Sequence, residues 1–295
     1  MSRSGLLCEV EQRRVLFQSS LLHWAVENTR IYPWRKPRSA PYQILVAEVL
    51  LKRTTATAAA KVYESFLQNY PTPLHLAAAS EEELVRALAP VGLYTQRARA
   101  VAKLARHLVE HEDGTVPCSL DKLLRVPGLG HYSARAVLSF GCGIPAAVVD
   151  ANVARVLHRV FQGVLPPRPT HALLQTIAEA LLPESAHEDF NFGLLDLGAV
   201  VCRYAGPRHA ECPLRDICDF ARSGQTAKPS VFGSRLRELR LAKRISLVQL
   251  AKRARVSKLT LINLEAGRTD PRAETVAKLA AALGVLPEDL GEKAS

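Results

Sequence analysis

The stretch that decides the fold runs from residue 123 to residue 161 and reads LLRVPGLGHYSARAVLSFGCGIPAAVVDANVARVLHRVF. Residues 126–130 (VPGLG) form a tight turn between two segments whose apolar residues recur at helical spacing. Glycine permits positive φ and close approach to a ligand. The second helix is expected to begin near His131, where free amide groups suit a phosphate. Two interpretations stay open here: a phosphate-binding hairpin, or a plain corner between helices.

An aspartate lies about twenty residues beyond the hairpin. Asp150 follows the apolar run 144–149 and precedes a helix expected to begin near Asn152. An aspartate at that place is a good N-cap, which is the simplest interpretation. The hairpin together with the phrase VDAN at 149–152 resembles the helix-hairpin-helix DNA glycosylases of the endonuclease III and MutY superfamily.

The resemblance extends over residues 15–221. Three further blocks carry it: PWR at 33–35 with PYQILVAEVLLKRTT at 41–55, GLYTQRA at 92–98, and DFNFGLLDLGAVVC at 189–202. It implies a DNA N-glycosylase that acts in base excision repair, with an all-α, two-lobed helical fold. Apolar residues at helical spacing and scarce strand-like alternation independently favour an all-α chain.

Tyr132 distinguishes between branches of this family. It lies where the endonuclease III branch carries a lysine, whose amine attacks the sugar and forms a Schiff base. A tyrosine cannot form that intermediate, so the enzyme is expected to be monofunctional and to leave an abasic site. Tyrosine here, with Leu50–Thr55 (LLKRTT), resembles the thymine/uracil mismatch glycosylases, which implies action on thymine or uracil opposite guanine.

The resemblance also implies catalytic roles for three residues. Asp150 would stabilise the positive charge that develops on the sugar and orient or deprotonate water. Glu48 lies within an apolar helical run, where a carboxylate is costly unless it faces a pocket or a partner. Tyr132 would line the base pocket or touch the flanking phosphate. The alternatives are an exposed helical glutamate for Glu48 and a packing aromatic for Tyr132.

The expected partner is double-stranded DNA. The formal net charge of +11 favours a polyanion, although some basic proteins are merely soluble. Leu93, in the turn at Gly92, is the candidate wedge into the duplex, with a buried loop leucine as the alternative. The residues expected to contact DNA in this domain are Gly128, Gly130, His131, Leu93, Tyr94, Lys52, Arg53 and Thr54.

A loop near residue 210 resembles the iron–sulfur motif of the family. Cys202, Cys212 and Cys218 fall on the first, third and fourth ligand positions, and His209 stands at the second. The resemblance implies a [4Fe–4S] cluster with three cysteine ligands and one histidine. A three-iron cluster, zinc and a loop without metal stay open. The remaining cysteines, Cys8, Cys118 and Cys142, show no pairing pattern and are interpreted as buried or incidental.

The chain is expected to divide into a glycosylase domain (1–221), a linker (222–230) and a small domain (231–295). Within the first, residues 31–140 would form the hairpin lobe, and residues 1–30 with 141–221 the iron–sulfur lobe. No apolar run approaches the ~20 residues that span a bilayer, and no secretory signal is evident. A cytoplasmic, nucleoid-associated protein is therefore expected.

The C-terminal residues resemble the five-helix, helix-turn-helix domain of phage-repressor-type regulators. Its second helix is expected at 246–254 with Ser246 as the cap, and its recognition helix at 257–265, closed by Gly267, Asp270 and Pro271. By resemblance, Lys258 and Leu259 face the bases. Such domains usually act as dimers, so a homodimer through this domain is an option, as is a protein-binding remnant.

Two rival functions remain at this stage. One is an adenine glycosylase acting opposite 8-oxoguanine, against which Tyr132 argues. The other is a non-catalytic, sequence-specific DNA-binding regulator on a glycosylase scaffold, against which the presence of both Asp150 and Glu48 argues.

Overall fold

The computed structural model describes residues 3–37, 39–224, 231–265, 269 and 271–291. Within these residues every regular element is a helix and no strand occurs, which confirms the predicted all-α class. The chain forms two compact units, residues 1–198 and 199–295. Residues 225–230 of the expected linker, together with Gly267 and Asp270, lie outside the described residues, and the predicted division at 222–230 stays a prediction.

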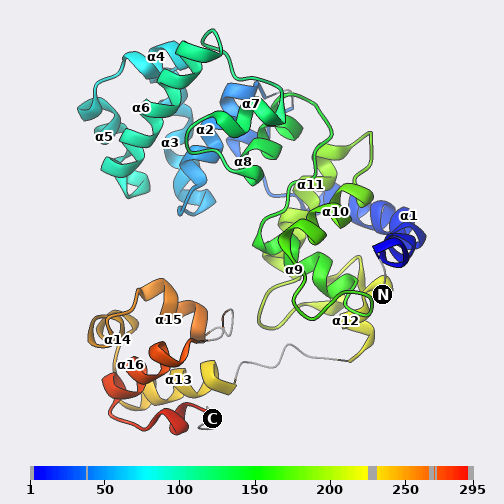
Figure 1. Ribbon diagram of the computed structural model, residues 1–295, viewed down its shortest axis with the longest axis vertical. Coiled ribbons are helices and arrows are strands. Elements are labelled where there is room, and N and C mark those ends of the chain that lie inside the picture. Colours follow the sequence, from blue (N-terminus) through cyan, green and yellow to red (C-terminus); the bar gives the residue numbers. More distant parts are fainter. Residues whose placement is uncertain (1–2, 38, 225–230, 266–268, 270, 292–295) are drawn as a thin grey trace. The chain divides into compact units, whose positions relative to one another are not determined.

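The first lobe of the N-terminal unit carries the hairpin (Figure 1). Its elements are η1 (Pro33–Arg35), α2 (Pro41–Leu51), α3 (Ala56–Asn69), α4 (Pro73–Ala78), α5 (Glu81–Leu88), η2 (Ala89–Val91), α6 (Tyr94–His111), α7 (Leu120–Arg125) and α8 (His131–Ala136), continued by the π-helical segment η3 (Val137–Gly141). Helix α2 is apolar all round and packs against α3 on one side and η3 on another, so it forms the centre of the lobe.

The second lobe combines the N-terminal helix with the helices that follow Asp150 (Figure 1). Its elements are α1 (Arg3–Asn28), α9 (Ala151–Val160), α10 (His171–Leu181), α11 (His187–Asp196) and η4 (Leu197–Val201), which continues α11. Phe17 of α1 is completely buried, and its ring centroid lies 6.3 Å from that of Phe161 and 6.0 Å from that of Phe190. This aromatic core holds α1 against the C-terminal part of the lobe.

The interpretation of Cys118 and Cys142 as buried or incidental is wrong. Cys118 and Cys142 form a disulfide with a Cα–Cα distance of 5.8 Å, and Cys8 is an exposed free cysteine. The two bonded residues precede α7 and follow η3, so the bond encloses the whole hairpin motif. Tertiary folding causes this pairing, because α7 and α8 pack together and return the chain to its starting point.

The second unit contains η5 (His209–Glu211), η6 (Arg215–Ile217), α12 (Asp219–Arg222), α13 (Val231–Ala242), α14 (Leu247–Ala254), α15 (Lys258–Glu265), α16 (Ala273–Leu283) and η7 (Pro287–Leu290). Ser246 caps α14 as predicted, accepting from the Gln249 amide at 3.2 Å. A buried ion pair joins Arg240 to Glu265, with Nε–Oε1 at 2.5 Å. Among the described residues, no helix has the length and apolar character needed to cross a bilayer.

Candidate active site and DNA interface

Asp150 is the N-cap of α9, and its carboxylate is fixed by three hydrogen bonds. Oδ1 accepts from the backbone amides of Asn152 at 2.8 Å and Val153 at 2.7 Å, while Oδ2 accepts from the Asn152 side-chain amide at 2.8 Å. The N-cap interpretation is therefore confirmed. Capping does not exclude a chemical role, because the side chain is only partly buried and its charge reaches residues of the other lobe.

Glu48 lies in the interior of α2 and is 7% exposed, which excludes the exposed-glutamate alternative. Its pKa is raised to about 7, mainly by burial and also by the charge of Asp150, although a hydrogen bond with Ser133 and the charge of Lys52 oppose this rise. A carboxyl group in this state exists in both protonation forms near neutral pH, as a proton donor or acceptor requires.

Tyr132 lies in the first turn of α8, and the charges of both carboxyl groups act on its phenol. Burial raises the pKa of its phenol well above the ordinary value, and the charges of Glu48 and Asp150 add to this rise. Tyr132 also packs against the hairpin core, so the aromatic has a structural role in addition to its place at the site. The structure thus gathers all three predicted catalytic residues, from α2, α8 and the start of α9.

A second layer of residues holds Asn152, the partner of Asp150. Arg155 donates to Asn152 Oδ1 at 2.9 Å and to the carbonyl of Gly198 at 2.6 Å. A Cβ atom on Gly198 would lie 2.8 Å from Cβ of Asn152, so a glycine is required for the two helices to approach. Sequence reasoning did not single out Arg155 or Gly198, because the packing of α11 and η4 on α9 is not apparent from local pattern.

Four of the predicted DNA-contacting residues, from three separate segments, border one hollow of about 180 Å³, and Thr54, Tyr94, Gly130 and His131 are not among its lining residues. Lys52 at the end of α2 hydrogen-bonds the carbonyl of Gly128 in the hairpin, and Arg53 and Leu93 line the same hollow. Leu93 is 48% exposed, which excludes the buried-loop alternative, and it adopts left-handed φ of +52°. Tyr94 is equally exposed.

Buried Arg97 of α6 organises this surface, a role that sequence reasoning missed. Its guanidinium donates to the carbonyl of Lys52 at 2.7 Å and to the Thr54 hydroxyl at 3.0 Å, and Thr54 in turn donates to the Val91 carbonyl at 2.9 Å. The last carbonyls of a helix lack partners within it. Arg97 supplies these missing hydrogen-bond partners at the end of α2. It thereby connects residues 52–54 to the loop that carries Leu93.

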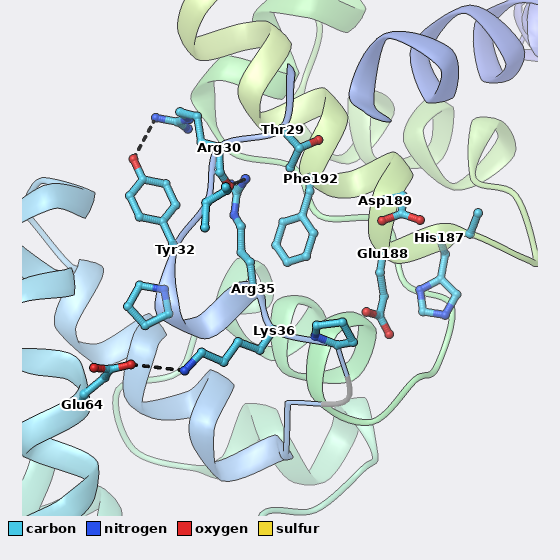
Figure 2. Close-up of a pocket in the computed structure, with 14 residues that line it drawn as sticks. Thr29, Arg30, Tyr32, Arg35, Lys36, Glu64, His187, Glu188, Asp189 and Phe192 are labelled. Atoms are coloured by element: carbon cyan, nitrogen blue, oxygen red, sulfur yellow. Dashed lines mark hydrogen bonds and ion pairs between the residues drawn. The ribbon is translucent and has the colours of Figure 1, made fainter. Parts of the chain in front are cut away.

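A cavity of about 920 Å³ lies between the segment 29–37 and the start of α11 (Figure 2). Beside it, Asp196 is completely buried and is bound by Arg30 Nε at 2.7 Å and Arg35 Nη1 at 2.6 Å. The Arg35 guanidinium also lies 4.4 Å from the Phe192 ring centroid. This ion cluster joins the segment 29–37, which connects α1 to α2, to α11.

The cysteine loop contains suitable donors for a metal cluster. Burial raises the pKa of the Cys212 thiol to about 12, and the charges of Cys202 and Cys218 add to this rise. The ring of His209 lies 5.7 Å from that of Phe220. In the part of the chain that the structure describes, however, no three His, Cys, Asp or Glu side chains are arranged to hold a metal ion.

In the C-terminal unit, helix α15 begins at the predicted place and presents its first residues to solvent. Lys258 is exposed, and Leu259 is 63% exposed. Leu261 and Leu264 of the same helix are buried in the domain core. The outward face of α15 is therefore free of contacts with the core of its own domain.

Comparisons with known proteins agree with this geometry. Residues 46–184 match the HhH-GPD superfamily of base excision DNA repair proteins, and residues 231–292 match a helix-turn-helix domain family. The chain is 40% identical to the thymine-DNA glycosylase of Aeropyrum pernix over 68% of this chain and 92% of the relative. It is 37% identical to the thymine/uracil-DNA glycosylase of Pyrobaculum aerophilum over 69% and 91%.

A solved structure described as a thermostable thymine-DNA glycosylase superposes with a TM-score of 0.69. The identity is 34%, over 72% of this chain and 98% of that one. The three catalytic candidates lie around one site, and the hairpin lies beside it. Together with the similarity to these relatives, this arrangement leads to one conclusion. The chain belongs to the HhH-GPD superfamily of base excision DNA repair proteins and is a DNA glycosylase with a helix-turn-helix domain at its C-terminal end.

Proposed function

We propose that this glycosylase hydrolyses the N-glycosidic bond of thymine or uracil opposite guanine and leaves the strand uncut. The observation that carries the proposal is the place of Tyr132 in the first turn of α8, where burial raises the pKa of its phenol and the charges of Glu48 and Asp150 add to the rise. A phenol forms no Schiff base, so water is the remaining nucleophile. The names of the relatives, thymine-DNA and thymine/uracil-DNA glycosylases, support the choice of base.

Asp150 acts on the sugar. Rupture of the glycosidic bond develops positive charge at C1′, as in other glycoside hydrolysis. The carboxylate is already fixed by its three hydrogen bonds, so it stabilises this charge without reorganising and orients the attacking water.

Glu48 acts on the base. Its raised pKa of about 7 keeps a proton on a fraction of the molecules at neutral pH. The protonated carboxyl donates to the departing pyrimidine, which would otherwise leave as an anion. Two carboxyl groups in different environments thus take different roles.

The hairpin and the hollow beside it hold the DNA. The amides of Gly128 and Gly130, with His131, grip a phosphate, which contributes affinity without sequence preference. Leu93 and Tyr94 enter the duplex where the extruded nucleotide leaves a gap, and a mismatched pyrimidine costs less to extrude than a paired one. Lys52 and Arg53 approach the DNA from the other edge of the hollow, and Thr54 follows them in the chain.

We further propose that Cys202, His209, Cys212 and Cys218 hold a [4Fe–4S] cluster that stabilises the loop and takes no part in bond cleavage. The donor types suit such a cluster. Absorbance near 400 nm and an iron assay on anaerobically purified protein test this assignment. Absence of iron, or a stoichiometric zinc content, would contradict it.

The C-terminal domain would add a second DNA contact through Lys258 and Leu259 on α15. A leucine at that place suits a thymine methyl group in the major groove. Because a single domain of this kind binds weakly, a homodimer is the form in which it would read a site. Sedimentation of the full chain with and without a duplex measures that state.

A panel of duplexes tests the main proposal. Duplexes carrying G·T, G·U, A·8-oxoguanine and thymine glycol are incubated with the full chain, followed by alkali to cut abasic sites. We expect product from G·T and G·U only after alkali treatment. Product from A·8-oxoguanine alone would replace the proposal with adenine excision, and cleavage without alkali would contradict the monofunctional mechanism.

A further inference from the structure

The segment that delivers Asp150 to the site has no regular structure, although residues 146–149 are buried. Buried backbone groups outside helices and sheets need partners from side chains or water. Here three polar side chains supply them. Gln175 donates to the Ala147 carbonyl at 2.9 Å, and His171 Nε2 lies 3.4 Å from the Val149 carbonyl. The third side chain, Asn191 of α11, makes the largest number of contacts.

Asn191 is 1% exposed and uses both ends of its amide. Its Oδ1 accepts from the Val148 amide at 3.0 Å. Its Nδ2 donates to the Ala146 carbonyl and to the Ser139 hydroxyl, each at 2.9 Å. One acceptor and two donors are the inventory of a side-chain amide, so every contact matches the chemistry of asparagine.

Ser139 connects this arrangement to the other wall of the site. It belongs to η3, the direct continuation of α8, so it shares one helical rod with Tyr132 and Ser133. Its hydroxyl accepts from Asn191 and also forms a hydrogen bond with Nδ1 of His187 at 3.0 Å. Both Ser139 and His187 are buried.

We propose that Asn191 is a positioning residue that sets the place of Asp150 relative to Tyr132 and Glu48. It links the rod that carries Tyr132 to the segment that ends at Asp150, two residues after Val148. The inference rests on the proposed function, because it assumes that Asp150 and Glu48 act on one extruded nucleotide. Aligned groups lose rate steeply when they move by about 1 Å, so the link acts on the chemical step.

The test compares three variants of the full chain. Asn191→Ala removes the whole link, and Ser139→Ala removes only its attachment to η3, which keeps the test usable if the first variant does not fold. Ile177→Ala is the matched control, because Ile177 is completely buried in α10 of the same lobe and makes no polar contact with the segment. Single-turnover rates on a G·U duplex, Kd for a duplex with a non-hydrolysable abasic analogue, and Tm are measured.

We expect Asn191→Ala to lower the single-turnover rate by about 10- to 100-fold, with Kd within about twofold of the unaltered chain. Ser139→Ala should lower the rate by a smaller factor. The unaltered chain should lose rate as the pH rises through about 7, the pKa of Glu48. In Asn191→Ala this fall should move to lower pH, because the charge of Asp150 helps to raise the pKa of Glu48. Ile177→Ala should lower Tm and leave both rate and pH profile unchanged.

A rate within twofold of the unaltered chain, or a loss of rate without movement of the alkaline limb, would overturn the inference. An equal loss of rate in Ile177→Ala would also overturn it, since the effect would then follow from stability alone. If the unaltered chain excises no pyrimidine from any duplex, the proposed function fails and not the positioning role.

Discussion

The two carboxyl groups of the site, those of Asp150 and Glu48, lie in different environments. Asp150 stands at the start of a helix, partly exposed, with both oxygens hydrogen-bonded to backbone and side-chain amides. Glu48 stands in the middle of a helix, buried among apolar residues, with a pKa raised to about 7. Burial favours the neutral form of a carboxyl group, so Glu48 is suited to carry a proton, whereas Asp150 is held in place by its hydrogen bonds. We call the side of the site that carries Asp150 the first wall and the side that carries Glu48 the second wall.

The largest expected effect comes from removing the charge of the first wall. Asp150→Asn keeps an N-cap, since asparagine caps helices as well as aspartate does. We expect the rate of excision to fall by about 10³-fold, while Kd for an abasic-analogue duplex stays within about threefold. Gel-shift titration and single-turnover kinetics on G·T measure both. Full activity of this variant would show that catalysis does not need the charge of Asp150. The proposed difference in role between Asp150 and Glu48 would then be wrong.

The second largest effect is expected from replacing Glu48, the carboxyl group of the second wall. Glu48→Gln removes the proton that leaves with the pyrimidine, so excision should fall by about 10²-fold. The unaltered enzyme should lose activity as pH rises through about 7, the pKa of Glu48, and the variant should lack this limb. A rate that rises through pH 7 instead would make Glu48 a base.

The same substitution should increase stability in alkali. The pKa of Glu48 is higher in the folded chain than its ordinary value of 4.5, so folding is unpenalised well below pH 4.5 and loses stability as pH rises toward 7. Relative to the unaltered chain, Glu48→Gln should be more stable by about 3 kcal/mol at pH 8 and by much less at pH 5. Denaturant unfolding at the two pH values checks the sign.

A smaller effect should follow from disturbing Asn152, the residue that holds Asp150 in place. Gly198→Ala places a Cβ 2.8 Å from Cβ of Asn152 and 3.0 Å from its backbone. We expect Tm to fall and excision to drop about tenfold, because Asn152 orients Asp150. Gly206→Ala is the control for stability, since Gly206 has positive φ and a Cβ added there would meet no atom within 4 Å. An equal loss of excision in both variants would argue against a role for Asn152.

The smallest catalytic effect is expected from the disulfide. Replacing Cys118 and Cys142 by serine opens the covalent loop around the hairpin, which typically costs about 2–4 kcal/mol of stability. Neither residue belongs to either wall, so excision should stay within about threefold. Thermal unfolding and single-turnover kinetics separate the two effects. A large loss of excision with intact DNA binding would show that the hairpin closure sets the geometry of the walls.

The sequence predicted the motifs but not the contacts that join segments distant in the chain. The hairpin, the cap at Asp150, the recognition helix and the helical class were all apparent from local pattern, because turns, caps and helical periodicity depend on neighbouring residues. The disulfide, buried Arg97 and the asparagine at 191 were missed. Each acts between segments tens of residues apart, and no spacing rule marks such a contact.

What the sequence by itself determined is the set of reactive groups: an aspartate after a hairpin, a tyrosine in place of a lysine, and a glutamate in an apolar helix. What only the tertiary structure decided is the state of those groups. Solvent exclusion around Glu48, and the approach of Asp150 to Glu48 and Tyr132, arise only when helices distant in the sequence pack together. A pKa depends on the surroundings of a group in three dimensions, and helix packing creates those surroundings.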